Sequence, residues 1–161
     1  MNHHETDQAE LNAALLDASK PMSTQTVFFH QFVAKYLGLH ITDHKCLDIV
    51  LENGRATAGQ LAELTGLTTG AITSVINRLV QAGFVRRVKD PHDLRIVYVE
   101  PLLSSLKPLQ EVFRPLAQEM MELHSRYKTD ELRLILDYLE RSTQILAKQT
   151  EHLKTSSAPE K

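Results

Sequence analysis

The sequence of 161 residues contains a single cysteine, Cys46, and no tryptophan. One cysteine forms no intrachain disulfide and leaves no CxxC motif for zinc or redox chemistry. No apolar run reaches the ~18 residues that a membrane-spanning helix needs. Residues 1–7 (MNHHETD) lack the basic and apolar segments of a secretory signal. We therefore expect a soluble, cytoplasmic protein with no membrane partner.

The chain has little net charge, since 18 Lys and Arg residues stand against 20 Asp and Glu residues. A net charge of −2 would ordinarily disfavour a nucleic-acid partner. The average conceals a local excess of positive charge in residues 83–95. That segment contains the basic residues Arg86, Arg87, Lys89 and Arg95 and the acidic residues Asp90 and Asp93. A locally positive binding surface is therefore compatible with the composition.

Helical patterns lie at both ends of the chain. Residues 7–18 favour a helix that ends at Lys20-Pro21, and apolar spacing predicts a second helix over residues 23–37. After residue 101 the sequence predicts helices over 103–127 and 130–153, the latter capped by Thr129 and Asp130. Leucines recur every seven residues in the last helix (Leu132, Leu139, Leu146 and Leu153). We predict that residues 1–38 and 101–154 form a dimer interface and that 155–161 are a flexible tail.

The central segment, residues 39–100, predicts three short helices followed by a hairpin. Thr42 is the expected cap of a helix over 42–53, Thr57 and Gln60 have the spacing of a capping box, and Thr68 precedes a helix over 68–82. Residues 84–88 and 96–99 are β-branched and aromatic runs around an Asp-Pro turn, which predicts two strands. The order indicates a mainly α winged helix-turn-helix with a small two- to three-stranded wing.

The helix over residues 68–82 has one apolar stripe and one small, polar face. The polar face comprises Thr69, Gly70, Thr73, Ser74, Asn77, Arg78 and Gln81. Such a face suits the major groove of DNA, and the helix N-terminus at Thr68 offers N–H groups to phosphate. We predict that Thr73 and Asn77 contact base edges and that Arg78 binds phosphate. Arg95, at the hairpin tip, is placed to enter a minor groove.

Four segments carry a family resemblance: GQLAELTGLTT (59–69), ITSVINRL (72–79), AGFVRR (82–87) and DPHDLR (90–95). In this order and spacing they resemble the MarR-type (multiple antibiotic resistance) transcriptional regulators. The resemblance implies a homodimeric, ligand- or stress-responsive repressor that binds a pseudo-palindromic operator through the 68–82 helix. It also implies that Asp93 orients Arg95 in the wing.

Four further residues could form an effector site. Phe28, Phe32, Tyr36 and Cys46 could line a pocket for a small aromatic or apolar effector, or could be core residues. No histidine spacing supports a metal site, and no catalytic set is present, so we expect no metal, no cofactor and no enzymatic activity. The alternative function is a winged-helix protein-interaction module that does not bind DNA. Steep salt dependence of DNA affinity would distinguish the two functions.

Overall fold

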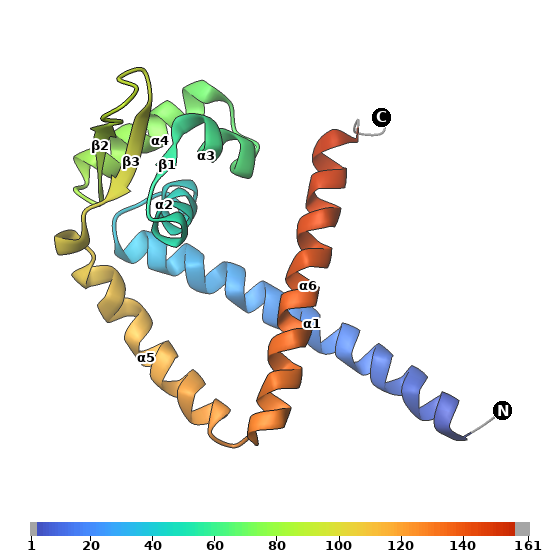
Figure 1. The fold of residues 1–161 in the computed structure, drawn as a ribbon. Helices are drawn as coiled ribbons and strands as arrows, with labels where there is room; N and C mark the ends of the chain where they lie inside the picture. The colour runs from blue at the N-terminus through green and yellow to red at the C-terminus, as the bar shows by residue number, and fades with distance from the viewer. Residues whose placement is uncertain (1–2, 157–161) are drawn as a thin grey trace. The chain divides into compact units, whose positions relative to one another are not determined.

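The structure, a computed structural model, describes residues 3–156, with side chains from residue 7 onward. The elements in chain order are α1 (His3–Tyr36), α2 (Ile41–Asn53), β1 (Ala56–Thr57), α3 (Ala58–Thr65), α4 (Thr69–Gln81), β2 (Val85–Lys89), β3 (Val97–Pro101), a 3₁₀ turn (Leu103–Ser105), α5 (Lys107–His124) and α6 (Thr129–Thr155) (Figure 1). The predicted mainly α fold with a small wing is confirmed. The chain divides into two compact units, Met1–Leu109 and Gln110–Lys161, which we describe separately. None of the described helices is long and apolar enough to cross a membrane.

α1 is one helix of 34 residues, so the predicted break at Lys20-Pro21 is wrong. Proline lacks an N–H group and therefore removes only the backbone hydrogen bond to the residue four positions earlier, Asp17. The helix continues on both sides of Pro21. Beyond the proline, Thr24 donates its hydroxyl hydrogen bond to the carbonyl of Lys20 at 3.1 Å. Pro21 therefore lies inside α1 and does not end it.

Three of the predicted helix caps lie at the starts of α2, α3 and α4 in the first compact unit. α2 begins at Ile41 with His40 as its N-cap residue, so the predicted cap at Thr42 is wrong. The capping box of α3 is confirmed: the N–H of Gln60 donates to Thr57 Oγ1 at 3.2 Å, and that of Thr57 donates to Gln60 Oε1 at 2.8 Å. Thr68 caps α4 as predicted, accepting a hydrogen bond from the N–H of Ala71.

The sheet is antiparallel with strand order β1-β3-β2. β2 and β3 form the predicted hairpin, displaced by one or two residues toward the C-terminus, with Arg87 opposite Val99. β1 is the third strand and pairs Ala56 with Val99. The hairpin and the four N-terminal helices share one apolar core, whose members include Val33, Ala34, Leu47, Val50, Leu61, Ile72, Val75, Ile76, Leu79, Phe84, Val85 and Val99.

The predicted helix over residues 103–127 is shorter than expected, because β3 and the 3₁₀ turn occupy the segment before Lys107. Pro108 is the second residue of α5, where its missing N–H costs no helical hydrogen bond. Lys128 is the N-cap residue of α6, so the predicted cap at Thr129 and Asp130 is displaced; the N–H of Lys128 donates to Glu131 at 2.7 Å. Thr155 still belongs to α6, and residues 157–161 of the predicted tail lie outside the described residues.

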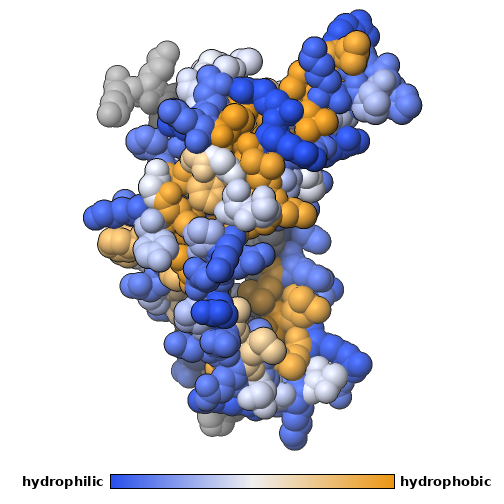
Figure 2. Space-filling view, turned by 90° about the vertical axis from the view of Figure 1, so that its left-hand side faces the viewer, coloured by the Kyte–Doolittle hydropathy of each residue, from blue (hydrophilic) through white to orange (hydrophobic). Residues whose placement is uncertain are grey.

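Many large apolar side chains are exposed on the described helices. Figure 2 shows apolar surface in patches between hydrophilic side chains. On α1 these residues include Leu11, Leu15, Leu16 and Met22; on α5, Leu116, Met120, Met121 and Leu123; and on α6, Leu134, Leu136, Leu139, Ile145, Leu146 and Leu153. Extended exposed apolar rows of this kind are typical of interaction surfaces.

Candidate nucleic-acid interface

α4 presents the predicted polar face to solvent. Ile72, Val75, Ile76 and Leu79 point into the core of the first unit. The exposed residues at and beyond the helix start are Thr68, Thr69, Gly70, Thr73, Ser74, Asn77 and Gln81. This set contains no bulky apolar side chain, so the surface is open to a nucleic-acid groove. The apolar stripe is where the sequence placed it, and so is the polar face except for Arg78, which is half-buried.

Two of the hydroxyl groups on this face, those of Thr73 and Ser74, are oriented by the helix itself. Thr73 donates its hydroxyl hydrogen bond to the carbonyl of Thr69 at 2.9 Å, and Ser74 donates to Gly70 at 3.1 Å. Each hydroxyl hydrogen is therefore used within α4, and the oxygen keeps its lone pairs. The outward surface of Thr73 consists of a methyl group and an acceptor oxygen, which suit a thymine methyl and an amino group of a base edge.

Asn77 is linked to the wing. Arg87 of β2 donates a hydrogen bond from Nη2 to Asn77 Oδ1 at 2.6 Å. Arg87 lies opposite the buried Val99 and therefore on the side of the sheet that faces the core and α4. The sequence analysis missed this contact, although strand alternation alone indicates that Arg86 and Arg87 point to opposite sides. The bond places a guanidinium beside the best candidate for base contact.

Arg78 has a different environment from the one that the sequence indicated. Its Nε and Nη2 donate hydrogen bonds of 2.8 and 2.6 Å to the two carboxylate oxygens of Asp43 in α2. Asp43 is only 1% exposed, whereas the Arg78 side chain is 41% exposed. The hydrogen bonds to Asp43 raise the pKa of Arg78. The guanidinium predicted to bind phosphate is therefore occupied by a buried carboxylate of its own chain.

The wing carries Arg95 in a fixed geometry. Its Nε and Nη2 donate to the two oxygens of Asp93 at 3.0 and 2.8 Å, and its backbone N–H donates to Asp93 Oδ1 at 3.0 Å. These side-chain and backbone hydrogen bonds lower the pKa of Asp93, so the carboxylate is ionised at neutral pH. The Arg95 side chain is 89% exposed. The pair leaves most of the Arg95 guanidinium available at the wing tip.

The turn that carries this pair is ordered by Asp90. Its Oδ1 accepts hydrogen bonds from the N–H groups of His92 and Asp93 at 2.8 and 3.0 Å. Lower on the hairpin, Arg86 pairs with Glu100 across the strands at 3.2 Å. Arg86 therefore lies on the opposite side of the sheet from Arg87, and the positive charges of the segment are distributed over both sides.

Comparison with known proteins places this arrangement in a family. Residues 39–97 match the pattern of the MarR family. YcgE of Bacillus subtilis (strain 168), described as an uncharacterized HTH-type transcriptional regulator, is 41% identical over 147 residues, covering 91% of this chain and 96% of that protein. The chain belongs to the MarR family. It is a DNA-binding transcriptional regulator, and the family consists of regulators rather than enzymes.

Solved structures share the MarR fold with this chain. The transcriptional regulator Tm0710 from Thermotoga maritima has a TM-score of 0.61 at 17% identity, over 86% of this chain and 98% of that one. The apo form of MarR from E. coli has a TM-score of 0.54 at 23% identity, over 80% of this chain and 96% of that one. At these identities the likeness shows the winged-helix fold alone.

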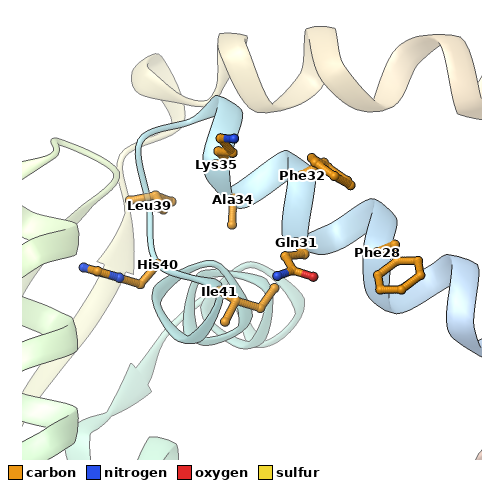
Figure 3. Close-up of a pocket in the computed structure, with 8 residues that line it drawn as sticks. All are labelled: Phe28, Gln31, Phe32, Ala34, Lys35, Leu39, His40 and Ile41. Atoms are coloured by element: carbon orange, nitrogen blue, oxygen red, sulfur yellow. The ribbon is translucent and has the colours of Figure 1, made fainter.

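A cavity of about 720 Å³ lies between the last turns of α1 and the start of α2 in this MarR family member. Of the four residues considered for an effector pocket, Phe28 and Phe32 line this cavity, whereas Tyr36 and Cys46 do not. The remaining lining residues are Gln31, Ala34, Lys35, Leu39, His40 and Ile41 (Figure 3). The cavity is therefore partly apolar and partly cationic.

Cys46 lies in the core instead. It is fully buried, and burial raises the pKa of its thiol to about 11. A reactive cysteine needs exposure and a lowered pKa, because the thiolate is the nucleophile. Cys46 has neither property and belongs to the apolar core of the first unit, which is the alternative that the sequence left open.

Proposed function

We propose that this MarR family regulator is a homodimeric repressor that binds a pseudo-palindromic operator and releases it in response to a small effector. The observation that carries the proposal is the hydrogen bond between Asn77 and Arg87. It joins the exposed polar face of α4 to the wing, so that helix and hairpin form one DNA-binding surface. Both parts of this surface keep their outward groups accessible to a duplex.

Each part has a distinct task in the proposed complex. Thr68, Thr69, Gly70, Thr73, Ser74 and Asn77 face the major groove, with Thr73 and Asn77 at base edges. Arg95, oriented by Asp93, enters the adjacent minor groove, whose negative potential attracts a guanidinium. Arg78 is proposed mainly to fix α4 against α2, because its Nε and one N–H of Nη2 bind Asp43 and leave only the remaining Nη1 and Nη2 hydrogens for phosphate.

The dimer rests on the uncovered apolar rows. Leu139, Leu146 and Leu153 recur every seven residues on α6 and are all exposed in the single chain. Burying such a row stabilises an assembly by about 25 cal/mol per Å² of apolar area. A two-fold dimer would present two α4 helices, so its half-sites should lie about 10 base pairs apart or a multiple of one DNA turn.

The effector is proposed to occupy the cavity of Figure 3. Its volume is within the ~300–1,000 Å³ typical of small-molecule sites. Phe28 and Phe32 offer aromatic surface, and Lys35 offers a cation, so a small aromatic molecule with a polar or anionic group fits best. Because the operator is chromosomal DNA, the regulator would work in the cytoplasm.

Selection of bound sequences from a random duplex library by the purified protein tests the proposal. We expect a two-fold symmetric sequence preference and an affinity that falls steeply between low and physiological salt, because bound phosphates release counterions. Transcription from a promoter containing the selected site should decrease when the protein is added. Weak binding without sequence preference or salt dependence would instead favour a protein-interaction module.

A further inference from the structure

Two histidines and an aspartate from different helices lie together in the first unit. His30 of α1 and His44 of α2 approach with Nδ1 and Nε2 3.1 Å apart. Asp48, one turn after His44, has Oδ1 3.6 Å from His44 Nδ1 and Oδ2 3.9 Å from His30 Nδ1. One possible ligand atom from each residue lies within 4.8 Å of the others. The sequence did not reveal this cluster, because His30 is 14 residues from His44.

We propose that His30, His44 and Asp48 form a binding site for a divalent transition-metal ion of the zinc class. Two imidazole nitrogens bound to a tetrahedral zinc ion lie roughly 3.3 Å apart, since each Zn–N bond is ~2.0–2.1 Å. The observed 3.1 Å needs only a small adjustment. Two imidazoles and one carboxylate leave a fourth position for water, and this donor set favours zinc, cobalt or nickel over magnesium or calcium.

The protonation state of the imidazoles agrees with this assignment. Burial lowers the pKa of both His30 and His44, so both rings are neutral at pH 7. Neutral imidazole is the form that binds metal. His30 Nδ1 and His44 Nε2 share one proton in their hydrogen bond, so the ring that donates it must move that proton to its other nitrogen before both rings can ligate the ion. The His44 side chain is fully buried, so its orientation is fixed by packing.

The positive charge of Lys45 opposes the binding of a cation at this site. Its ammonium lies 3.2 Å from Asp48 Oδ2, and its charge contributes to the lowered pKa of both histidines. To ligate a metal, Asp48 must turn from Lys45 toward the imidazoles, and its side chain is partly exposed and able to do so. The site should therefore be of moderate affinity, and removing the lysine charge should strengthen it.

An ion at this site would tie α1 to α2. Asp43, the residue before His44, holds Arg78 of α4, so the helix that supplies two of the three ligands also positions the DNA-binding helix. The proposed metal site does not rest on the proposed DNA-binding function. Metal binding without DNA binding would overturn only the proposed function. DNA binding without metal binding would overturn only the metal site.

The test uses full-length protein carrying His3→Gln and His4→Gln, because adjacent terminal histidines bind metals adventitiously. Titration calorimetry with Zn²⁺, and visible absorption with Co²⁺, should give one ion per chain, while Mg²⁺ should give no binding. In this background His30→Gln should weaken Zn²⁺ at least tenfold and Asp48→Asn about tenfold, an effect comparable to the loss of supporting ligands in other metal sites. Lys45→Ala should tighten binding.

His124→Gln is the matched control, since His124 is exposed on α5 and lies outside the cluster. It should leave affinity and stoichiometry unchanged. Circular dichroism checks that each variant is folded. His44 is buried and its replacement disturbs the packing of α2, so the partly exposed His30 decides the outcome. Zn²⁺ affinity that is equal in His30→Gln, Asp48→Asn and the background protein would overturn the proposal, as would the absence of Co²⁺ absorption bands.

Discussion

Arg78 on α4, the helix proposed to bind DNA, donates two hydrogen bonds to the buried carboxylate of Asp43 on α2. The partners are unequal: the arginine can reach water, but the aspartate cannot. Removing Arg78 therefore leaves a buried charge without its partner, whereas removing the Asp43 charge leaves an arginine that water can solvate. The contact is primarily structural and fixes α4 against α2.

Arg78→Ala should lower the free energy of unfolding by about 2–3 kcal/mol, below the ~3–5 kcal/mol of fully buried pairs because Arg78 is partly exposed. Asp43→Asn should cost less, about 1–2 kcal/mol. Denaturant unfolding of both single variants and the double variant measures the coupling. Equal stability of Arg78→Ala and the unmodified protein, with reduced affinity for every duplex, would restore the phosphate-binding role.

Asn77→Ala should reduce affinity for the selected site by about 1–3 kcal/mol and flatten the preference at one base pair in each half-site. Arg87→Ala is the control, because it removes the hydrogen-bond partner of Asn77 but leaves the amide in place. It should weaken all duplexes similarly. A selected sequence that is unchanged in Asn77→Ala would place the base contacts elsewhere on α4.

Asp93→Asn separates orientation from charge in the wing. The change removes a negative charge, so electrostatics alone should strengthen DNA binding. If Asp93 acts by orienting Arg95, affinity should decrease instead. Arg95→Ala should reduce affinity and lower the salt slope by about one contact. Fluorescence anisotropy over a range of salt concentrations measures both quantities, and tighter binding by Asp93→Asn would contradict the orienting role.

Leu146→Glu should shift the protein from dimer to monomer, because it places a charge in the apolar row of α6. Lys148→Glu, two residues away, is the matched control and should leave the dimer intact. Light scattering coupled to size-exclusion chromatography measures the mass. A dimer that persists in Leu146→Glu at micromolar concentration shows that α6 is not the interface.

Cys46 should resist alkylation by iodoacetamide in the folded protein, since it is fully buried. In guanidinium chloride the same thiol should react within minutes at pH 8. Mass spectrometry of samples quenched at intervals follows the reaction. Rapid labelling under native conditions would show that α2 opens readily and exposes Cys46 to reagents.

Much of the DNA-binding lobe could be predicted from local pattern. Three of its features depend on residues three or four positions apart: the buried stripe of α4, the Thr68 cap and the capping box of α3. Such spacing can be recognised directly in the sequence. The exposed polar face followed directly, because a helix with one buried stripe must show the other side. The sequence left open whether the wing has two or three strands, and the structure shows that β1 is the third.

The failures share a physical cause, which is that partners far apart in sequence decided the outcome. Nothing local shows that Asp43 is buried beside Arg78, 35 residues away, or that His30 meets His44. Cys46 belonged to an apolar stripe in either interpretation, and only packing distinguished core from pocket. The predicted helix end at Lys20-Pro21 is wrong because a long helix tolerates the loss of a single backbone hydrogen bond.

The length of α1 has a mechanical consequence. At 1.5 Å per residue the helix measures about 50 Å, and within the first unit only its final turns, around Val33 and Ala34, are buried. It therefore behaves as a lever whose fulcrum lies at α2, beside both the cavity and the histidine pair. A tilt of about 5° at that fulcrum displaces the far end by about 4 Å over this length. A surface packed against the N-terminal half of α1 in an assembly would move by a similar distance, so small changes near α2 would disturb such a contact.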